Sequence, residues 1–222
     1  MRAERHDRLP GSAQLGGDPR RGGHRQPADR HADQQARTLT LQLVEQEPDP
    51  AIEALKRRQV DVVLAHSYSV LPRDFPGNSQ QEVLMEDPVL LCLPAGRAQL
   101  LELAPDEPVD LTRLAGEAWL TPGPETSCYQ MIQRTCGVAG FVPDVRVRSS
   151  DFSVLLSLVA AGAGIALAPR LTIGAQPGIS VHPLLTPVAR TVFTVSRTGT
   201  ARRPDVHLLS TPLKQAAAAS MR

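Results

Sequence analysis

Apolar and polar residues alternate in the first regular part of the chain. Residues 39–44 alternate as a strand does, and 60–65 form a mostly apolar strand. Between them, Asp49 and Pro50 are typical of a helix start, and Ile52 and Leu55 lie on one face of the helix that follows. The pattern predicts a strand, a helix and a strand, joined by a right-handed crossover.

The segment from Leu155 to Pro169 carries the strongest signal in the sequence. Leu155, Leu158 and Val159 have helical spacing, and two glycines follow before a short apolar run that ends at Pro169. This pattern predicts a helix, a glycine turn and a strand buried on both faces, which is half of a βαβ unit. Ligands of such sheets bind at the carboxyl ends of strands.

The remaining pattern predicts short elements of both kinds. We expect a helical turn at 110–116, helices at 126–135 and 204–219, and strands at 82–85, 89–93, 118–121, 144–148, 179–184 and 191–196. The first two of these strands are separated by Glu86, Asp87 and Pro88. The mixture indicates an α/β fold.

Residues 1–37 have a different composition. They contain no Val, Ile, Phe, Tyr or Trp, and eight Arg against five acidic residues. Such a segment buries too little apolar area to offset the entropy of ordering it, so a disordered tail is expected. A basic arm that touches nucleic acid is the alternative.

Composition narrows the function classes further. Residues 38–222 hold 16 basic and 18 acidic residues, so this part of the chain is not a phosphate-binding surface and direct DNA binding is not expected. Cys92, Cys128 and Cys136 fit neither a metal site nor a disulfide set and are expected to be reduced packing residues. No apolar run predicts a membrane span or a signal peptide, and a cytoplasmic location is expected.

Five segments in order resemble one family. They are Asp61–Leu64, Val89–Pro94, Asp110-Leu111 before Trp119-Leu120, Gly140–Pro143 and Val159–Pro169. Together they are similar to the effector-binding half of LysR-type transcriptional regulators, over residues 38–222. The resemblance implies a two-lobed fold of the periplasmic-binding-protein type with two crossover strands.

The resemblance also implies a division of the chain. Residues 38–94 would start lobe I, 95–169 would form lobe II, and 170–222 would return to lobe I. The family's winged helix-turn-helix is not recognisable before Thr38, nor are the first strand and helix of lobe I. The sequence therefore reads as a truncated regulator, and 1–37 as a non-native segment such as an out-of-frame read of a GC-rich gene.

The first group of candidate effector-binding residues precedes the helix predicted at 126–135. Thr121 is the last residue of a predicted strand, Pro122 follows it, and Thr126 and Ser127 open the helix. Free backbone N–H groups and hydroxyls at a helix start can hold a carboxylate. Simple helix capping is the alternative for these residues.

A second group comes from two other strand ends. Ser150 precedes the next helix, and His66 and Ser67 follow the strand 60–65. Arg146 or Arg148 could supply positive charge, but the alternation leaves their direction open. Capping and ordinary surface roles remain the alternatives for Ser150 and His66.

The sequence contains no nucleophile elbow, phosphate loop or metal-spaced His/Cys set, so no catalytic residue, metal or cofactor is predicted. The leading interpretation is a domain that senses a small-molecule effector, with a carboxylate expected, and that partners a second copy or a full-length paralogue. A stand-alone solute-binding domain of the same fold, or a non-functional gene fragment, is the alternative.

Overall fold

The computed structural model describes residues 41–200 and 203–220, which belong to one compact unit, Leu41–Arg222. The elements are α2 (Pro48–Lys56), β1 (Val62–Tyr68), β2 (Ser79–Pro94), α3 (Ala95–Leu100), η1 (Leu111–Leu114), β3 (Ala118–Thr121), α4 (Ser127–Val138), β4 (Asp144–Arg148), α5 (Phe152–Ala160), β5 (Ala166–Pro169), η2 (Arg170–Thr172), β6 (Ile179–Pro183), β7 (Ala189–Arg197) and α6 (Pro204–Ser220). The predicted α/β class is confirmed. The predicted tail, residues 1–37, lies outside the described residues.

Strand β2 runs through both parts of the fold and pairs with strands in each. Its first part, Ser79–Pro88, pairs antiparallel with β7, which in turn pairs with β1. Its second part, Val89–Pro94, pairs with β5 and β6. We call the part built on Ser79–Pro88 lobe I (α2, β1, β7 and α6) and the part built on Val89–Pro94 lobe II (α3 to β6).

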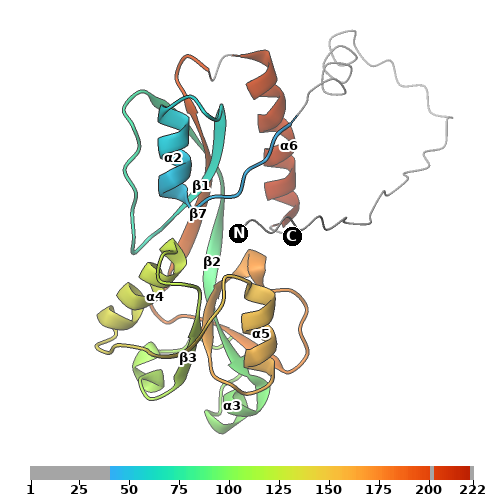
Figure 1. Cartoon of the computed structure of the whole chain (residues 1–222). Helices are drawn as coiled ribbons and strands as arrows, with labels where there is room; N and C mark the ends of the chain where they lie inside the picture. The colour runs from blue at the N-terminus through green and yellow to red at the C-terminus, as the bar shows by residue number, and fades with distance from the viewer. Residues whose placement is uncertain (1–40, 201–202, 221–222) are drawn as a thin grey trace, which may run out of the picture. The chain divides into compact units, whose positions relative to one another are not determined.

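Two helices cover opposite faces of the lobe I strands (Figure 1). Leu55 of α2 packs with Val63 and Ala65 of β1, and with Phe193 and Val195 of β7. The alternate residues of these strands face α6, because side chains alternate across a strand. The amphipathic pattern of 49–56 therefore correctly predicted which face of α2 is buried.

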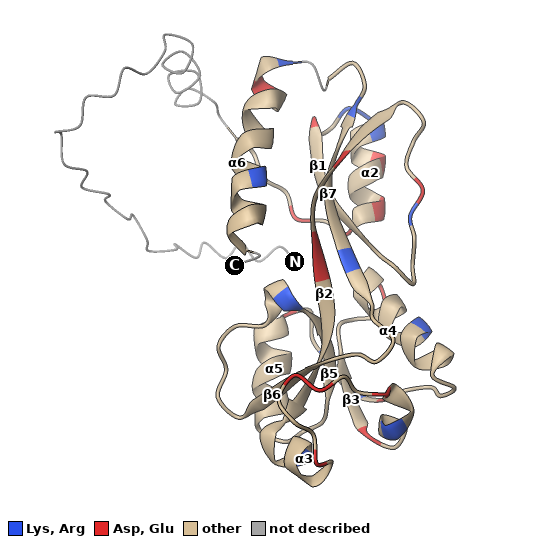
Figure 2. Ribbon diagram, turned by 180° about the vertical axis from the view of Figure 1, so that it is seen from behind, with Lys and Arg blue, Asp and Glu red and all other residues tan. Residues whose placement is uncertain are grey.

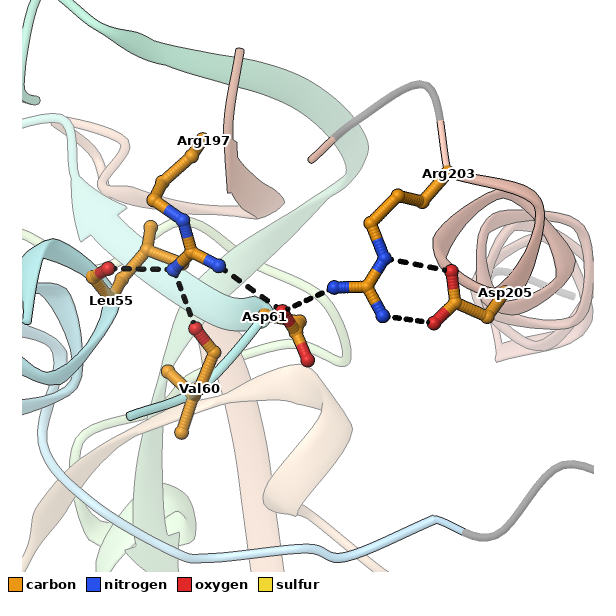
Figure 3. Close-up of polar contacts among 6 residues, drawn as sticks. All are labelled: Leu55, Val60, Asp61, Arg197, Arg203 and Asp205. Atoms are coloured by element: carbon orange, nitrogen blue, oxygen red, sulfur yellow. Dashed lines mark hydrogen bonds and ion pairs between the residues drawn. The ribbon is translucent and has the colours of Figure 1, made fainter. Parts of the chain in front are cut away.

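Two arginines near the C-terminal end of lobe I form hydrogen bonds with the segment between α2 and β1 (Figure 3). Arg197 donates to the carbonyl oxygens of Leu55 and Val60, at 2.7 Å each, and to Asp61 at 3.1 Å. Arg203, just before α6, donates to the same Asp61 carboxylate at 3.0 Å. The C-terminal helix is thus tied to the turn between α2 and β1.

Lobe II follows the sequence prediction closely. The helix α5 ends at Ala160, Gly162 has a φ of 83°, and β5 is buried along its whole length. The start of β5 also meets β3, because Leu120 N–H donates to Ile165 O and Ile165 N–H donates to Ala118 O, both at 2.8 Å. Strand β4 extends this arrangement by parallel pairing with β3.

Two strand predictions are wrong. Leu41, Leu43 and Val44 are irregular and exposed, and the rest of the predicted strand 39–44 lies outside the described residues. An alternating pattern makes a strand only where a neighbour accepts its backbone hydrogen bonds. Among the described residues the segment has none, so the predicted strand–helix–strand unit reduces to α2 and β1.

The second correction concerns β2. The predicted strands 82–85 and 89–93 form one continuous strand, in which Glu86, Asp87 and Pro88 pair with β7. The charge of Asp87 does not break the strand, because Arg190 of β7 lies opposite and neutralises it.

The strand pairing also bears on the lobe boundaries. Strand β6 pairs with Leu90–Pro94, although it lies beyond the predicted end of lobe II at residue 169. We therefore propose that lobe II continues to residue 188 and that the chain returns to lobe I at β7.

Candidate functional site

Ser127, at the start of α4 in lobe II, contacts two residues of lobe I. Its backbone N–H and its hydroxyl both lie 3.1 Å from Oε2 of Glu47. Its hydroxyl is also 2.8 Å from Nε2 of His66. Of the predicted site residues, Ser127 and His66 are thus brought together, and Glu47 joins them.

Local sequence explains why Ser127 is available for these contacts. Thr126, not Ser127, is the N-cap of α4, and its Oγ1 accepts the Tyr129 N–H at 3.2 Å. The same hydroxyl donates to Gly123 O at 2.7 Å. The capping alternative therefore holds for Thr126, while the Ser127 side chain points to lobe I.

The hydrogen positions in this cluster follow from its chemistry. An ionised carboxylate only accepts hydrogen bonds, so the single hydroxyl proton of Ser127 goes to Glu47. The Nε2 of His66 then carries a proton and donates to Ser127 Oγ. Burial lowers the pKa of His66, and the nearby positive charge of Arg190 lowers it further, while Glu47 opposes the shift. The neutral imidazole with Nε2–H fits this environment.

A pocket of about 450 Å³ opens beside this cluster. It lies between the segment that starts α2 and the segment that starts α4, and Arg73 also lines it. Arg73 is ion-paired with Asp49, and its Nε is buried and has no hydrogen-bond partner among the described residues. Ser127 is the predicted site residue that lines this pocket.

The residues at the end of β3 are buried rather than open. Thr121 is fully buried, and its Oγ1 has no partner within the described part of the chain. Pro122 is buried beside it. The Thr121 carbonyl oxygen accepts the Ser149 N–H at 3.1 Å, which joins β3 to the loop before α5.

Three other candidates lie away from the pocket lining. Ser150 is exposed, and Asp151 caps α5 instead by accepting the Ser153 N–H at 2.8 Å. His66 and Ser67 are inside β1 rather than after it, because the strand continues to Tyr68. Successive strand residues face opposite sides, so Ser67 does not share the face of His66.

The basic residues predicted for the site are not the ones that approach it. Arg146 is exposed and paired with Asp144. Arg190 is the nearby cation, and it is held by Asp87 of β2 through Nε at 3.1 Å and Nη2 at 2.6 Å. Sequence reasoning missed Glu47, Arg73 and Arg190, and only the resemblance to a two-lobed fold could have suggested that lobe I residues reach α4.

The described part of the chain gives three further observations on its charge and chemistry. Basic and acidic residues are interspersed along the elements (Figure 2). Within 41–200 and 203–220, no group of three or more His, Cys, Asp or Glu residues could hold a metal ion. In the same residues, no helix has the length and apolarity needed to cross a bilayer.

The α/β fold is of the periplasmic-binding-protein type and matches that of LysR effector-binding domains. The sequence model of the LysR substrate binding domain matches residues 27–218, so the chain belongs to this family. The match begins inside the segment 1–37 that the composition set apart. No curated protein matches the chain by sequence.

Solved structures agree with this fold. The effector binding domain of BenM with its effector benzoate has a TM-score of 0.67 at 21% identity, over 86% of this chain and 84% of that chain. The C-terminal domain of a probable LysR family transcriptional regulator from Rhodococcus sp. RHA1 has a TM-score of 0.66 at 17% identity, over 86% and 91%. A Corynebacterium glutamicum OxyR C206 mutant has a TM-score of 0.66 at 18% identity, over 85% of this chain and 58% of that chain.

Proposed function

We propose that the chain is the effector-sensing domain of a LysR-type regulator and that its effector is a small carboxylate bound at the start of α4. The observation that carries the proposal is the pair of contacts from Ser127 N–H and Oγ to one carboxylate oxygen. A helix start that holds the carboxylate of a side chain has the donor geometry to hold that of a ligand. The benzoate named for BenM is a carboxylate of this kind.

The proposal assigns roles to individual residues. Ser127 donates to the ligand, His66 orients the Ser127 hydroxyl, and Arg73, which is paired with Asp49, is the one basic residue in the described lining of the pocket. Thr121, whose buried hydroxyl has no partner among the described residues, is assigned as a further donor, which requires the end of β3 to move on binding. Pro122 and Thr126 shape the loop, while Ser67 and Ser150 are assigned no contact with the ligand.

The biological setting follows from the family. We propose that this domain reports ligand binding to a DNA-binding domain, and that it acts in the cytoplasm with a second copy or a full-length paralogue. Residues 38–222 carry more acidic than basic residues, so contact with DNA is assigned to the partner and not to these residues.

Calorimetry with benzoate as the probe tests the ligand class. Ser127→Ala should weaken binding by about 1.5 kcal/mol, the range for a hydrogen bond to a charged group, and Thr121→Ala by about 1 kcal/mol. Ser150→Ala is the matched control, since Ser150 is exposed and outside the pocket lining. Equal affinities in Ser127→Ala and Ser150→Ala would refute the proposed site.

A further inference from the structure

The acidic residue at the start of α4 comes from the opposite lobe. Glu47 belongs to the segment before α2, and its carboxylate takes both the N–H and the hydroxyl proton of Ser127, 80 positions away in the sequence. Ser127 has no other proton to donate. A ligand carboxylate that uses these two donors must therefore displace Glu47.

Within the described part of lobe I, the Glu47 side chain has no hydrogen-bond partner, although the charge of Arg73 acts on it. Glu47 is the N-cap residue of α2, but its side chain makes no capping hydrogen bond, and Pro48 occupies the first turn where an N–H would otherwise need a partner. Its contact with α4 is thus not a by-product of building α2.

The Nε–H of Arg73 is a second donor near the Glu47 carboxylate. Arg73 lines the same pocket, and its buried Nε has no hydrogen-bond partner in the described part of the chain. An unpaired buried donor is costly, and a carboxylate that turned toward it would relieve this cost. Arg73 thus offers a donor that the Glu47 carboxylate could accept from after leaving Ser127.

We propose that Glu47 is an internal competitor that closes lobe I onto α4 until an anionic ligand displaces it. We call the contact between Glu47 and Ser127 the latch. The identity of the ligand rests on the proposed function, but the latch itself is a property of the free protein. Without ligand, the Glu47 carboxylate occupies the two donors of Ser127. An anionic ligand must therefore bind these donors more strongly than Glu47 does in order to displace it. The expected contribution of the latch is about tenfold in ligand affinity, as for one hydrogen bond to a charged group.

The latch can be tested on the full chain without ligand, by amide exchange measured with NMR. In Glu47→Ala the Ser127 amide should exchange about tenfold faster than in the wild type, because it loses its acceptor. Glu45→Gln is the matched control, since Glu45 is exposed and lies two residues away. Unchanged exchange at Ser127 in Glu47→Ala, with the Leu120 amide still protected as evidence of folding, would overturn the latch.

Titration with benzoate then tests the competition. Glu47→Gln should bind benzoate about tenfold more tightly than the wild type, while binding of neutral benzamide should not change. Equal benzoate affinity in Glu47→Gln and the wild type would overturn the competitor role. If no variant binds benzoate, the carboxylate assignment of the proposed function fails, and the exchange experiment alone decides whether the latch exists.

Discussion

Asp87 is the one fully buried acidic side chain among the described residues, and three donors meet it. Arg190 donates to it twice, and the Leu171 N–H donates to it at 3.1 Å. These donors come from β7 and η2, so one carboxylate joins β2 to both at the place where the lobes meet. A buried charge is tolerated only when it is paired and hydrogen-bonded in this way.

Removal of the arginine that pairs with Asp87 should lower the free energy of unfolding. Arg190→Met leaves the buried carboxylate with a single N–H donor, and the free energy of unfolding should fall by about 3 kcal/mol. Urea denaturation measures the change. Arg146→Met is the matched control, because the Arg146–Asp144 pair is exposed and should contribute less than about 0.5 kcal/mol. Similar losses in both variants would contradict this account of Asp87.

The partly buried position of His66 predicts a dependence of stability on pH. Burial, with the charge of Arg190, places the pKa of His66 in the folded protein below its ordinary value of 6.5. The unfolded chain then binds the proton more readily, so stability is fully present above about pH 6.5 and falls as the pH drops below it. In His66→Gln, which keeps a donor for Ser127 but does not titrate, this part of the fall should disappear. Identical pH profiles of unfolding would show that His66 is not responsible.

At the residue scale the sequence predicted single members of the candidate site but not their contacts. Ser127 and His66 could be named because hydroxyls at a helix start and polar residues near a strand end are local signals. Glu47 could not be named, since no local pattern tells which distant helix a side chain will reach. The pairing of Asp87 with Arg190 was hidden for the same reason.

At the scale of elements, the local signals were reliable where the neighbours are close in sequence. The helix, glycine turn and strand at 155–169 are present as predicted, since the helix stop and the buried strand depend on local residues. The strand predicted at 39–44 is absent in its described part, because a strand also depends on a partner strand, which can lie far along the chain. Residue pattern alone does not supply that partner.

Gly164 gives the sharpest test of this helix–turn–strand segment. A Cβ at Gly164 would run into the Ala118 carbonyl group and the buried Leu120 side chain. Gly164→Ala should therefore destabilise the protein by about 3 kcal/mol, at the upper end for overpacking a core. The matched control is Gly137→Ala on α4, where the added methyl group meets nothing and should stabilise the helix by about 0.5–1 kcal/mol. A folded Gly164→Ala protein of wild-type stability in thermal unfolding would contradict the packing described.

At the scale of the whole molecule, the two lobes differ in how much they bury. The described core of lobe I is one small cluster around Leu55 and Phe193, whereas lobe II contains the two larger clusters around Trp119 and Leu156. Strand β1 pairs with β7 on one side and has no strand partner on the other within the described residues. Leu64 of this strand is 58% exposed. Lobe I is therefore the less stable part of the described structure.

Hydrogen exchange should reveal this difference. We expect low protection in residues 41–65 and higher protection in 118–168, because the former make fewer buried contacts and leave one strand edge unpaired. Mass spectrometry of peptides from the native protein measures both regions in one experiment. Uniform, strong protection across the two regions would mean that another segment completes lobe I.

The central claim is that an anionic effector binds where Glu47, His66 and Ser127 meet. An NMR titration of the full chain with benzoate tests it most directly, with benzamide as the neutral control of the same shape. The account predicts that the amide signals of Glu47, His66 and Ser127 shift together and saturate at one affinity, with little response to benzamide. Shifts confined to the apolar groove around Val109, Val138 and Leu185, or equal responses to both compounds, would contradict it.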